Sequence, residues 1–254
     1  MSKFIRYTEC PVKINEDFYL AKRASIGAQA SATNPIEFGG KVGTSTGIGP
    51  ERSEFFMQYF VTGENDPIAN LTGKNSCSGS FGGIEFSGAY LTNYHIGIKP
   101  YAPVEMSARF VVLSGFSNNI QESSFSENDY TVANGANVEL TNMNYLNIGM
   151  DNPVEITYEV ACERIPSFVI GSSYPRHVNL GAVEKYLDIN GDDIGDVINY
   201  QERDIAEISI KASDELGRSR GQTLFCSGAI ENQRLDISAG GTLNGQVSIK
   251  EVIR

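Results

Sequence analysis

The residues best suited to chemistry form a short polar run in the second half of the chain. Oxygen-bearing side chains stand at alternate positions in this run, as they do in a calcium-binding loop. The candidate ligands are Asp188, Asn190, Asp192 and Asp196. The run departs from that loop at its sixth position, where Asp193 replaces glycine, and at its twelfth, where Asn199 replaces a bidentate glutamate. The pattern predicts a calcium site or, on the plainer interpretation, a solvated turn.

Groups for general-base or nucleophilic catalysis are scarce. The sequence has two histidines: His95, in a run of alternating polarity, and His177, in a loop. Neither belongs to a GxSxG or HExxH motif. Gly73-Lys74 is followed by Asn75, where a phosphate-binding loop needs Ser or Thr. We therefore expect no enzyme and no cofactor, although two distant carboxylates that meet in space would leave no local signature.

The amino-acid composition limits which kinds of fold can position these groups. The 254 residues are 41% hydrophobic, enough to bury a core, and carry a net charge of −11. Such an acidic surface repels phosphate, which disfavours ordinary binding to the outside of nucleic acid. A content of 26 Gly, 12 Tyr and 13 Phe, with no Trp, is typical of a turn-rich β protein.

Two further features indicate a soluble protein made in a cytoplasm. No apolar run reaches the roughly 18 residues that a membrane span needs, and the first residues lack the pattern of a secretion signal. The four cysteines lie far apart, without a CxxC pair, which favours buried thiols over disulfides or a metal site. They are Cys10, Cys77, Cys162 and Cys226.

Alternation of apolar and polar residues with a period of two dominates the chain and predicts half-buried strands. The expected inward-facing residues are every second residue of four segments: Tyr90 to Ile98, Val104 to Val112, Val154 to Cys162, and Ala206 to Ala212. The segment 55–61 is apolar on both faces, as in a strand covered on both sides. Helical periodicity is limited to two short stretches, 67–71 and 182–187.

Short repeated sequence segments indicate two related halves. Pro103-Val104-Glu105 is echoed by Pro153-Val154-Glu155, and Cys77-Ser78-Gly79 by Cys226-Ser227-Gly228. The polar stretch 117–137 is the best linker candidate. We therefore predict a mainly β fold of two barrel-like or sandwich-like antiparallel modules, with Gly-rich loops and little helix. The expected division is a first module at 1–116, the linker at 117–137 and a second module at 138–254.

The segment 77–110 resembles virion structural proteins of tailed bacteriophages, particularly the tail-tube-like group of contractile-tailed phages. The similarity lies in the run Phe86-Ser-Gly-Ala-Tyr-Leu-Thr-Asn-Tyr94, followed by Pro103-Val104 and an alternating strand. The segment 227–249 has the same character, and the two together cover about a quarter of the chain. A single tube module is usually shorter than this chain, and doubling of the module, as in some baseplate hub proteins, would reconcile the length.

The resemblance implies a structural protein of the virion, made in the host cytoplasm, that forms a ring or tube conducting DNA. Its partners would be copies of itself in a ring, other virion proteins, and DNA passing without sequence-specific binding, with no membrane partner. The alternatives are a capsid-surface, neck or baseplate hub component of the same virion, or a fibre-type receptor-binding β module. That last function needs exposed aromatic residues, and the candidates are Tyr94, Tyr101, Tyr130 and Tyr145.

Two surfaces are expected to serve assembly. The first is a glycine-rich loop that has few apolar anchors of its own and should order against a neighbour. Its residues are Gly39, Gly40, Gly43, Gly47, Gly49 and Pro50. The second is the acidic stretch 184–207, which predicts either a solvated face or the wall of a channel or inter-subunit seam. Its central residues are Asp192, Asp193 and Asp196.

Overall fold

Strands account for nearly all of the regular structure in the computed structural model, which describes residues 11–32, 48–60, 66–73, 75–117, 138–141, 153–192, 205–213, 219–237, 239 and 243–253. The first half contains β1 (Pro11–Ile14), β2 (Asp17–Ala32), β3 (Ile48–Phe60), the 3-10 helix η1 (Pro67–Thr72), β4 (Cys77–Phe81), β5 (Ile84–Ile98) and β6 (Glu105–Val112). The second half contains β7 (Val138–Thr141), β8 (Pro153–Ser167), β9 (His177–Asp192), β10 (Ile205–Ser213), β11 (Ser219–Ile237) and β12 (Leu243–Ile253).

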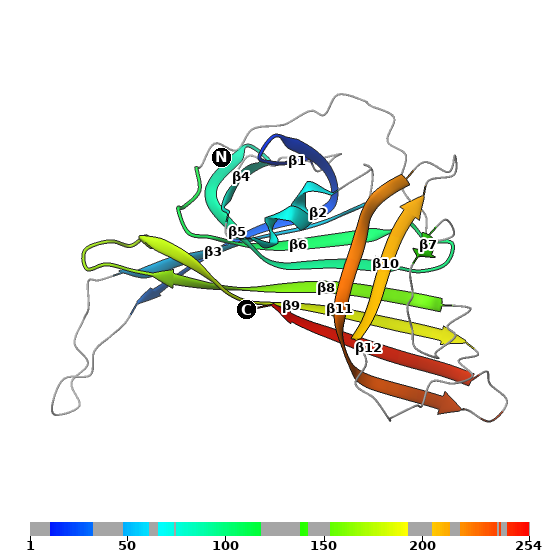
Figure 1. Ribbon diagram of the computed structural model, residues 1–254. Helices are drawn as coiled ribbons and strands as arrows, with labels where there is room; N and C mark the ends of the chain where they lie inside the picture. The colour runs from blue at the N-terminus through cyan, green and yellow to red at the C-terminus, as the bar shows by residue number, and fades with distance from the viewer. Residues whose placement is uncertain are drawn as a thin grey trace.

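All twelve strands belong to one antiparallel sheet, in the order β4-β1-β2-β3-β6-β5-β8-β9-β12-β11-β10-β7. Strand β4 also pairs with β5, so strands β1 to β6 form a closed cycle of hydrogen-bonded pairs, which we call the ring. Figure 1 shows the ring at the upper left and β10 and β11 crossing over the rest of the sheet. The predicted mainly β, antiparallel class is therefore confirmed.

The sheet is continuous between the two predicted modules. Strand β5 pairs with β8 over six residues, from Asn93 opposite Ala161 to Ile98 opposite Ile156. One hydrophobic core also contains residues of both halves, such as Val12 and Val247. The predicted linker, 117–137, lies outside the described residues except for Ser117. The division into modules stays a prediction.

Burial follows the predicted alternation along β6 and, from Ile156 onward, along β8. Val154 was predicted to face inward but is exposed, because a register shift between Pro153 and Glu155 interrupts the pairing there. Met106, Ala108 and Phe110 point into the core, as do Ile156, Tyr158 and Val160. In β5 the prediction is right from Tyr94 onward and wrong before it, because Leu91 is buried where Thr92 was expected to be. A bulge between Leu91 and Asn93 shifts the register by one residue and exchanges the two faces of the strand.

One of the two expected helical stretches is confirmed. Residues 67–71 lie in η1, which begins at Pro67, a favourable first residue because it needs no amide partner. The stretch 182–187 lies instead in β9, where pairing with both β8 and β12 overrides its weak helical pattern. No helix in the described ranges has the length and apolar character needed to cross a membrane.

Candidate assembly surface

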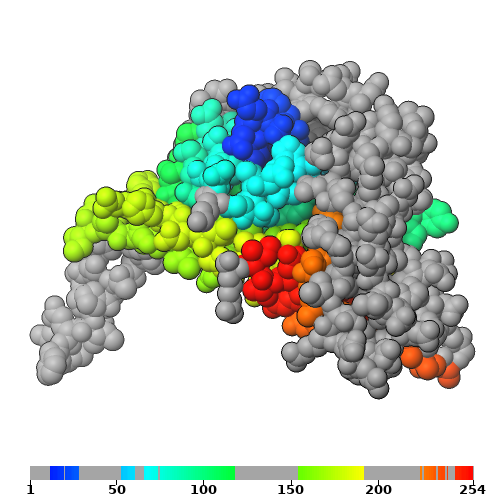
Figure 2. Space-filling view, in the orientation of Figure 1, coloured from blue at the N-terminus to red at the C-terminus, as the bar shows by residue number. Residues whose placement is uncertain are grey.

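The most prominent feature outside the core is a two-stranded ribbon formed by the end of β8 and the start of β9. Pairing of β8 with β5 ends at Ala161, and pairing of β12 with β9 ends at Val183. Beyond these points, from Arg164 opposite Leu180 to Ser167 opposite His177, the two strands pair only with each other within the described part of the chain. We call residues 163–182 the arm. Figure 2 shows it as a narrow yellow-green projection at the left.

The tip of the arm is an ordered turn. The Ser172 amide donates to the Val169 carbonyl at 3.2 Å, and Gly171 has a φ of +85°, as the third residue of a type II turn requires. The Ser172 hydroxyl donates to the Tyr174 carbonyl at 2.8 Å and accepts from the Tyr174 amide at 3.2 Å. The Arg176 amide closes the ribbon on the Ser167 carbonyl at 2.9 Å. The tip therefore has a defined shape before it meets any partner.

Apolar side chains cover this tip. Residues 165–175 include no charged side chain, and Ile170 at the apex is fully exposed. The other exposed members of the cluster are Ile165, Phe168, Val169 and Tyr174. Several exposed apolar side chains gathered on one ordered projection are typical of a surface that binds another molecule. The arm tip is thus the strongest candidate contact in the described structure.

The base of the arm is fixed by Arg164. A bulge between Cys162 and Arg164 turns the ribbon at this point. The guanidinium donates from Nε to the Leu91 carbonyl at 2.8 Å, from Nη2 to Leu71 at 3.1 Å and from Nη1 to Gly73 at 2.6 Å. These three bonds join β8 to β5 and to the end of η1. The arm is therefore attached to the ring by a planar, multidentate group rather than by chain connectivity alone.

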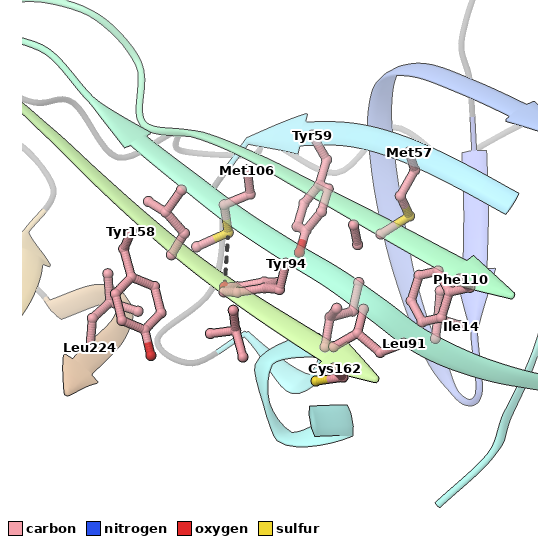
Figure 3. Packing of buried hydrophobic residues seen from close by; sticks show 14 of the residues in the cluster. Ile14, Met57, Tyr59, Leu91, Tyr94, Met106, Phe110, Tyr158, Cys162 and Leu224 are labelled. Atoms are coloured by element: carbon pink, nitrogen blue, oxygen red, sulfur yellow. Dashed lines mark hydrogen bonds between the residues drawn. The ribbon is translucent and has the colours of Figure 1, made fainter. Parts of the chain in front are cut away.

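The other end of η1 is anchored in the core by Asp66. Its Oδ1 accepts the Ile68 amide at 3.1 Å, which caps the helix, while its Oδ2 accepts the hydroxyls of Tyr59 at 2.5 Å and Tyr94 at 2.9 Å. Figure 3 shows Tyr59 and Tyr94 beside Met106, whose sulfur lies 3.6 Å from the Tyr94 hydroxyl. Burial raises the pKa of Asp66, and the hydrogen bonds from the tyrosines and Ile68 oppose that rise. Asp66 and Arg164 together hold η1 at both ends.

A second open surface lies at the opposite side of the molecule from the arm. Strand β7 is the outermost strand of the sheet, and it pairs with β10 only from Ser209 to Ala212. Residues 205–208 of β10 pair with β11 on one side and with no described strand on the other. Figure 1 shows β7 and β10 at the right and the arm at the left. We call β7 together with residues 205–208 of β10 the open edge.

The outward face of the sheet is polar, and several of its acids are matched by donors on neighbouring strands. Glu105 accepts Lys22 at 2.6 Å and Gln58 at 2.8 Å, and the bond from Lys22 lowers the pKa of Glu105. Asn93 donates to Glu159 at 2.5 Å. These cross-strand pairs keep strand register but contribute little stability each, because solvent screens them.

Glu184, the first acid of the acidic stretch, is also paired. Glu184 accepts the Tyr186 hydroxyl and lies 3.4 Å from the Lys250 ammonium, and its pKa is lowered, first by the bond from Tyr186. Lys185 binds Glu251 at 2.9 Å in a half-buried pair. Of the predicted channel or seam residues, Asp192 is the last residue of β9, while Asp193 and Asp196 lie outside the described residues. The predicted acidic lumen stays a prediction.

The candidate calcium ligands fall partly within β9. Asp188 is registered between Thr157 and Ser248, and Asn190 between Glu155 and Gln246. Alternate positions of a strand lie about 6.6 Å apart along the chain, so the described residues do not curl around one ion. No group of three or more His, Cys, Asp or Glu side chains in the described ranges lies close enough to hold a metal. The predicted calcium loop depends on residues beyond Asp192, including Asp196, which are not among those described.

The remaining predicted residues are dispersed. Gly39, Gly40, Gly43 and Gly47 lie outside the described residues, whereas Gly49 and Pro50 belong to β3, which starts at Ile48 opposite Ala32. His95 lies on the outward face of β5, opposite Ser107 and Glu159. The expectation that His177 lies in a loop is wrong: it is the first residue of β9 and pairs with Ser167.

Two further predictions concern buried side chains. Tyr94 is buried and binds Asp66, so it cannot be an exposed aromatic platform, whereas Tyr101 is exposed. Tyr130 and Tyr145 are not among the described residues. The expectation of buried thiols is confirmed for Cys77, Cys162 and Cys226, whereas Cys10 lies outside the described residues. Burial raises the pKa of Cys77 to about 12.

Sequence reasoning missed the arm. The available signal was the uncharged run 165–175, whose apolar triplet Phe168-Val169-Ile170 reads as a buried segment when taken alone. Comparison with known proteins adds no relative: no family model matches the chain. No curated protein matches it either.

Proposed function

We propose that the chain is a structural subunit of a bacteriophage virion that assembles head to tail into a ring or tube. The observation that carries this proposal is the placement of the apolar arm and the open edge at opposite sides of one molecule. Two different surfaces that bind each other form a heterologous contact, and repetition of such a contact yields a closed ring or an open filament. The partner of the arm is therefore the open edge of the next copy.

The physical chemistry of both surfaces supports this contact. A two-stranded ribbon is only marginally stable in water by itself, and the arm would gain a third strand by pairing with a neighbour. The outer side of the open edge pairs with no other strand among the described residues, and its backbone groups are of the kind that a neighbouring strand satisfies. Burial of Phe168, Val169 and Ile170 would add the hydrophobic contribution to this contact.

The resemblance of segment 77–110 to tail-tube-like proteins supports the virion role, and the charge of −11 suits a channel that DNA passes without adhering to the wall. In this proposal the subunit performs no chemistry. Copies of the chain form a wall in which each copy is joined to the next by backbone pairing and an apolar contact.

The test is the oligomeric state of the full chain at about 100 μM, where a contact with a Kd of ~10 μM is largely formed. Light scattering and negative-stain images of the wild-type protein should show rings or tubes. A Phe168→Asp/Ile170→Asp variant should be monomeric with an unchanged circular dichroism spectrum, because both side chains lie on the exposed tip.

Phe18→Asp is the control, because Phe18 is exposed on β2 and belongs neither to the arm nor to the open edge. It should assemble like the wild type. A wild-type chain that stays monomeric at this concentration, or an arm variant that assembles as well as the control, would overturn the proposal.

A further inference from the structure

An open pocket of about 620 Å³ lies where the arm meets the ring. Its walls come from the β1–β2 turn, from β4, from the start of β5 and from the segment after β6, and Tyr174 of the arm completes them. Small-molecule sites typically measure ~300–1,000 Å³. The pocket therefore has room for a small organic ligand. It shares Tyr174 with the arm tip and has no lining residue in the open edge.

Hydrogen bonds hold the walls in place. The Asn15 amide donates to the Ser78 carbonyl at 2.7 Å, and the Ser78 amide donates back to Oδ1 of Asn15 at 3.1 Å. On the other side, the Glu85 amide donates to the Ser117 hydroxyl at 3.0 Å, and the Ser117 amide donates to the Glu85 carbonyl at 2.9 Å. Two reciprocal pairs between segments distant in sequence make a preformed pocket, so a ligand would lose little free energy in ordering it.

The aromatic wall depends on Gly115. This residue has a φ of +81°, and a Cβ added to it would lie 3.3 Å from the Tyr174 hydroxyl. Glycine thus permits both the backbone conformation and the close approach of Tyr174. Tyr174 is 43% exposed, so part of its side chain remains available to a ligand. Behind it, Phe116 packs edge-on against the buried Phe86 with ring centroids 6.2 Å apart.

The polar groups define the class of ligand. The lining contains one base, Lys13, and one acid, Glu85, so neither an anion nor a cation is favoured by net charge. Five serines complete it: Ser78, Ser80, Ser87, Ser114 and Ser117. The hydroxyls of Ser87 and Ser114 bond each other at 3.0 Å, and the Ser117 hydroxyl accepts the Glu85 amide, but a hydroxyl can make more than one hydrogen bond, so these groups keep capacity for a ligand. A purely apolar ligand would desolvate the serines without supplying these further bonds. The lining suits a neutral molecule that carries many hydroxyls and an apolar face.

We propose that this pocket binds a neutral saccharide of one or two rings. The sugar hydroxyls would pair with the serines, Lys13 and Glu85, and one face of a sugar ring would lie against Tyr174. The inference goes beyond the structural role, because it needs no contact between copies of the chain.

Saturation-transfer NMR on the full chain tests this, with maltose, lactose and N,N′-diacetylchitobiose as probes at ~5 mM, which detects a Kd near 1 mM. At least one of the three should receive saturation from the wild-type protein. Tyr174→Ala should reduce that signal at least about threefold, because it removes the stacking surface. Tyr101→Ala is the matched control, since Tyr101 is exposed and does not line the pocket, and it should leave the signal unchanged.

Glu85→Gln supplies a second variant that keeps the shape of the side chain while removing its charge, and it too should weaken the signal. Absence of saturation transfer to all three probes would overturn the proposal. So would a signal that survives both Tyr174→Ala and Glu85→Gln in folded protein. Displacement of the sugar by inorganic phosphate at equal concentration would show an anion site instead, and would likewise overturn it.

Discussion

Replacing Arg164 tests whether the arm is held by its guanidinium. Arg164→Met keeps the length of the aliphatic stem and removes the donors to three carbonyls. The bonds to Leu91 and Leu71 are part-buried, whereas the bond to Gly73 is exposed, so water can replace the last one. At about 1.5 kcal/mol for each part-buried bond from a charged donor, the free energy of unfolding should fall by about 3 kcal/mol. Arg164→Lys should lose about 2 kcal/mol, because an ammonium cannot span all three acceptors.

Urea denaturation followed by circular dichroism measures this loss, and hydrogen exchange locates it. Amides in the arm base and in η1 should exchange faster in the Met variant. Arg109→Met is the control, because the Arg109 guanidinium makes an exposed 3.8 Å contact with Glu54 and lies 5.8 Å from the centroid of the Phe56 ring. Loss of these two weak contacts should cost less than about 1 kcal/mol. A loss for Arg164→Met below about 1 kcal/mol, or equal to that of the control, would refute the idea that Arg164 fixes the arm.

Three further outcomes are expected. Burial raises the pKa of Asp66, so the folded state holds this proton at a pH where the unfolded state has lost it. The free energy of unfolding should therefore fall as pH rises between the unfolded and folded pKa values, and Asp66→Asn should remove this fall in denaturation series from pH 3 to 7. The same pH dependence in Asp66→Asn and wild type would show that another group causes it. In a Cys10→Ser background, the thiols of Cys77, Cys162 and Cys226 should react with a disulfide reagent only after urea unfolds the chain, because burial shields each thiol and raises its pKa. Rapid labelling of the native protein would contradict their burial. Gly79→Ala should destabilise the fold by about 2 kcal/mol or more, since its Cβ would lie 2.5 Å from the Lys13 carbonyl oxygen; thermal melting that stays within 1 °C of wild type would exclude that clash.

Local pattern predicts the strands well and their distant contacts poorly. The inward faces of β6, and of β8 from Ile156 onward, follow from alternation alone, because one face of each lies on the core. Val154 departs from the alternation beside the register shift at Glu155. The reversal at Leu91 does not follow, because a bulge inserts one residue without changing the local composition. Residues 182–187 mislead for a related reason: pairing on both sides of β9 decides their state.

The polar contacts are harder still to foresee. Asn65-Asp66-Pro67 reads as a turn, and only closure of the ring brings Tyr59 and Tyr94 to the carboxylate of Asp66. Arg164 likewise reaches carbonyls more than seventy positions away in the chain. The arm itself is recognisable from sequence only once the neighbouring strands β5 and β12 are known to end before it.

Closure of the ring has a consequence for symmetry. A sheet ordinarily has two margins, but pairing of β4 with both β1 and β5 leaves β7 as the single terminal strand among those described. A molecule with one margin and one arm is a polar object, with a distinct front and back. If copies join arm to edge as proposed, every subunit in the ring faces the same way, so the two faces of the ring differ and a stack of rings has two chemically different ends.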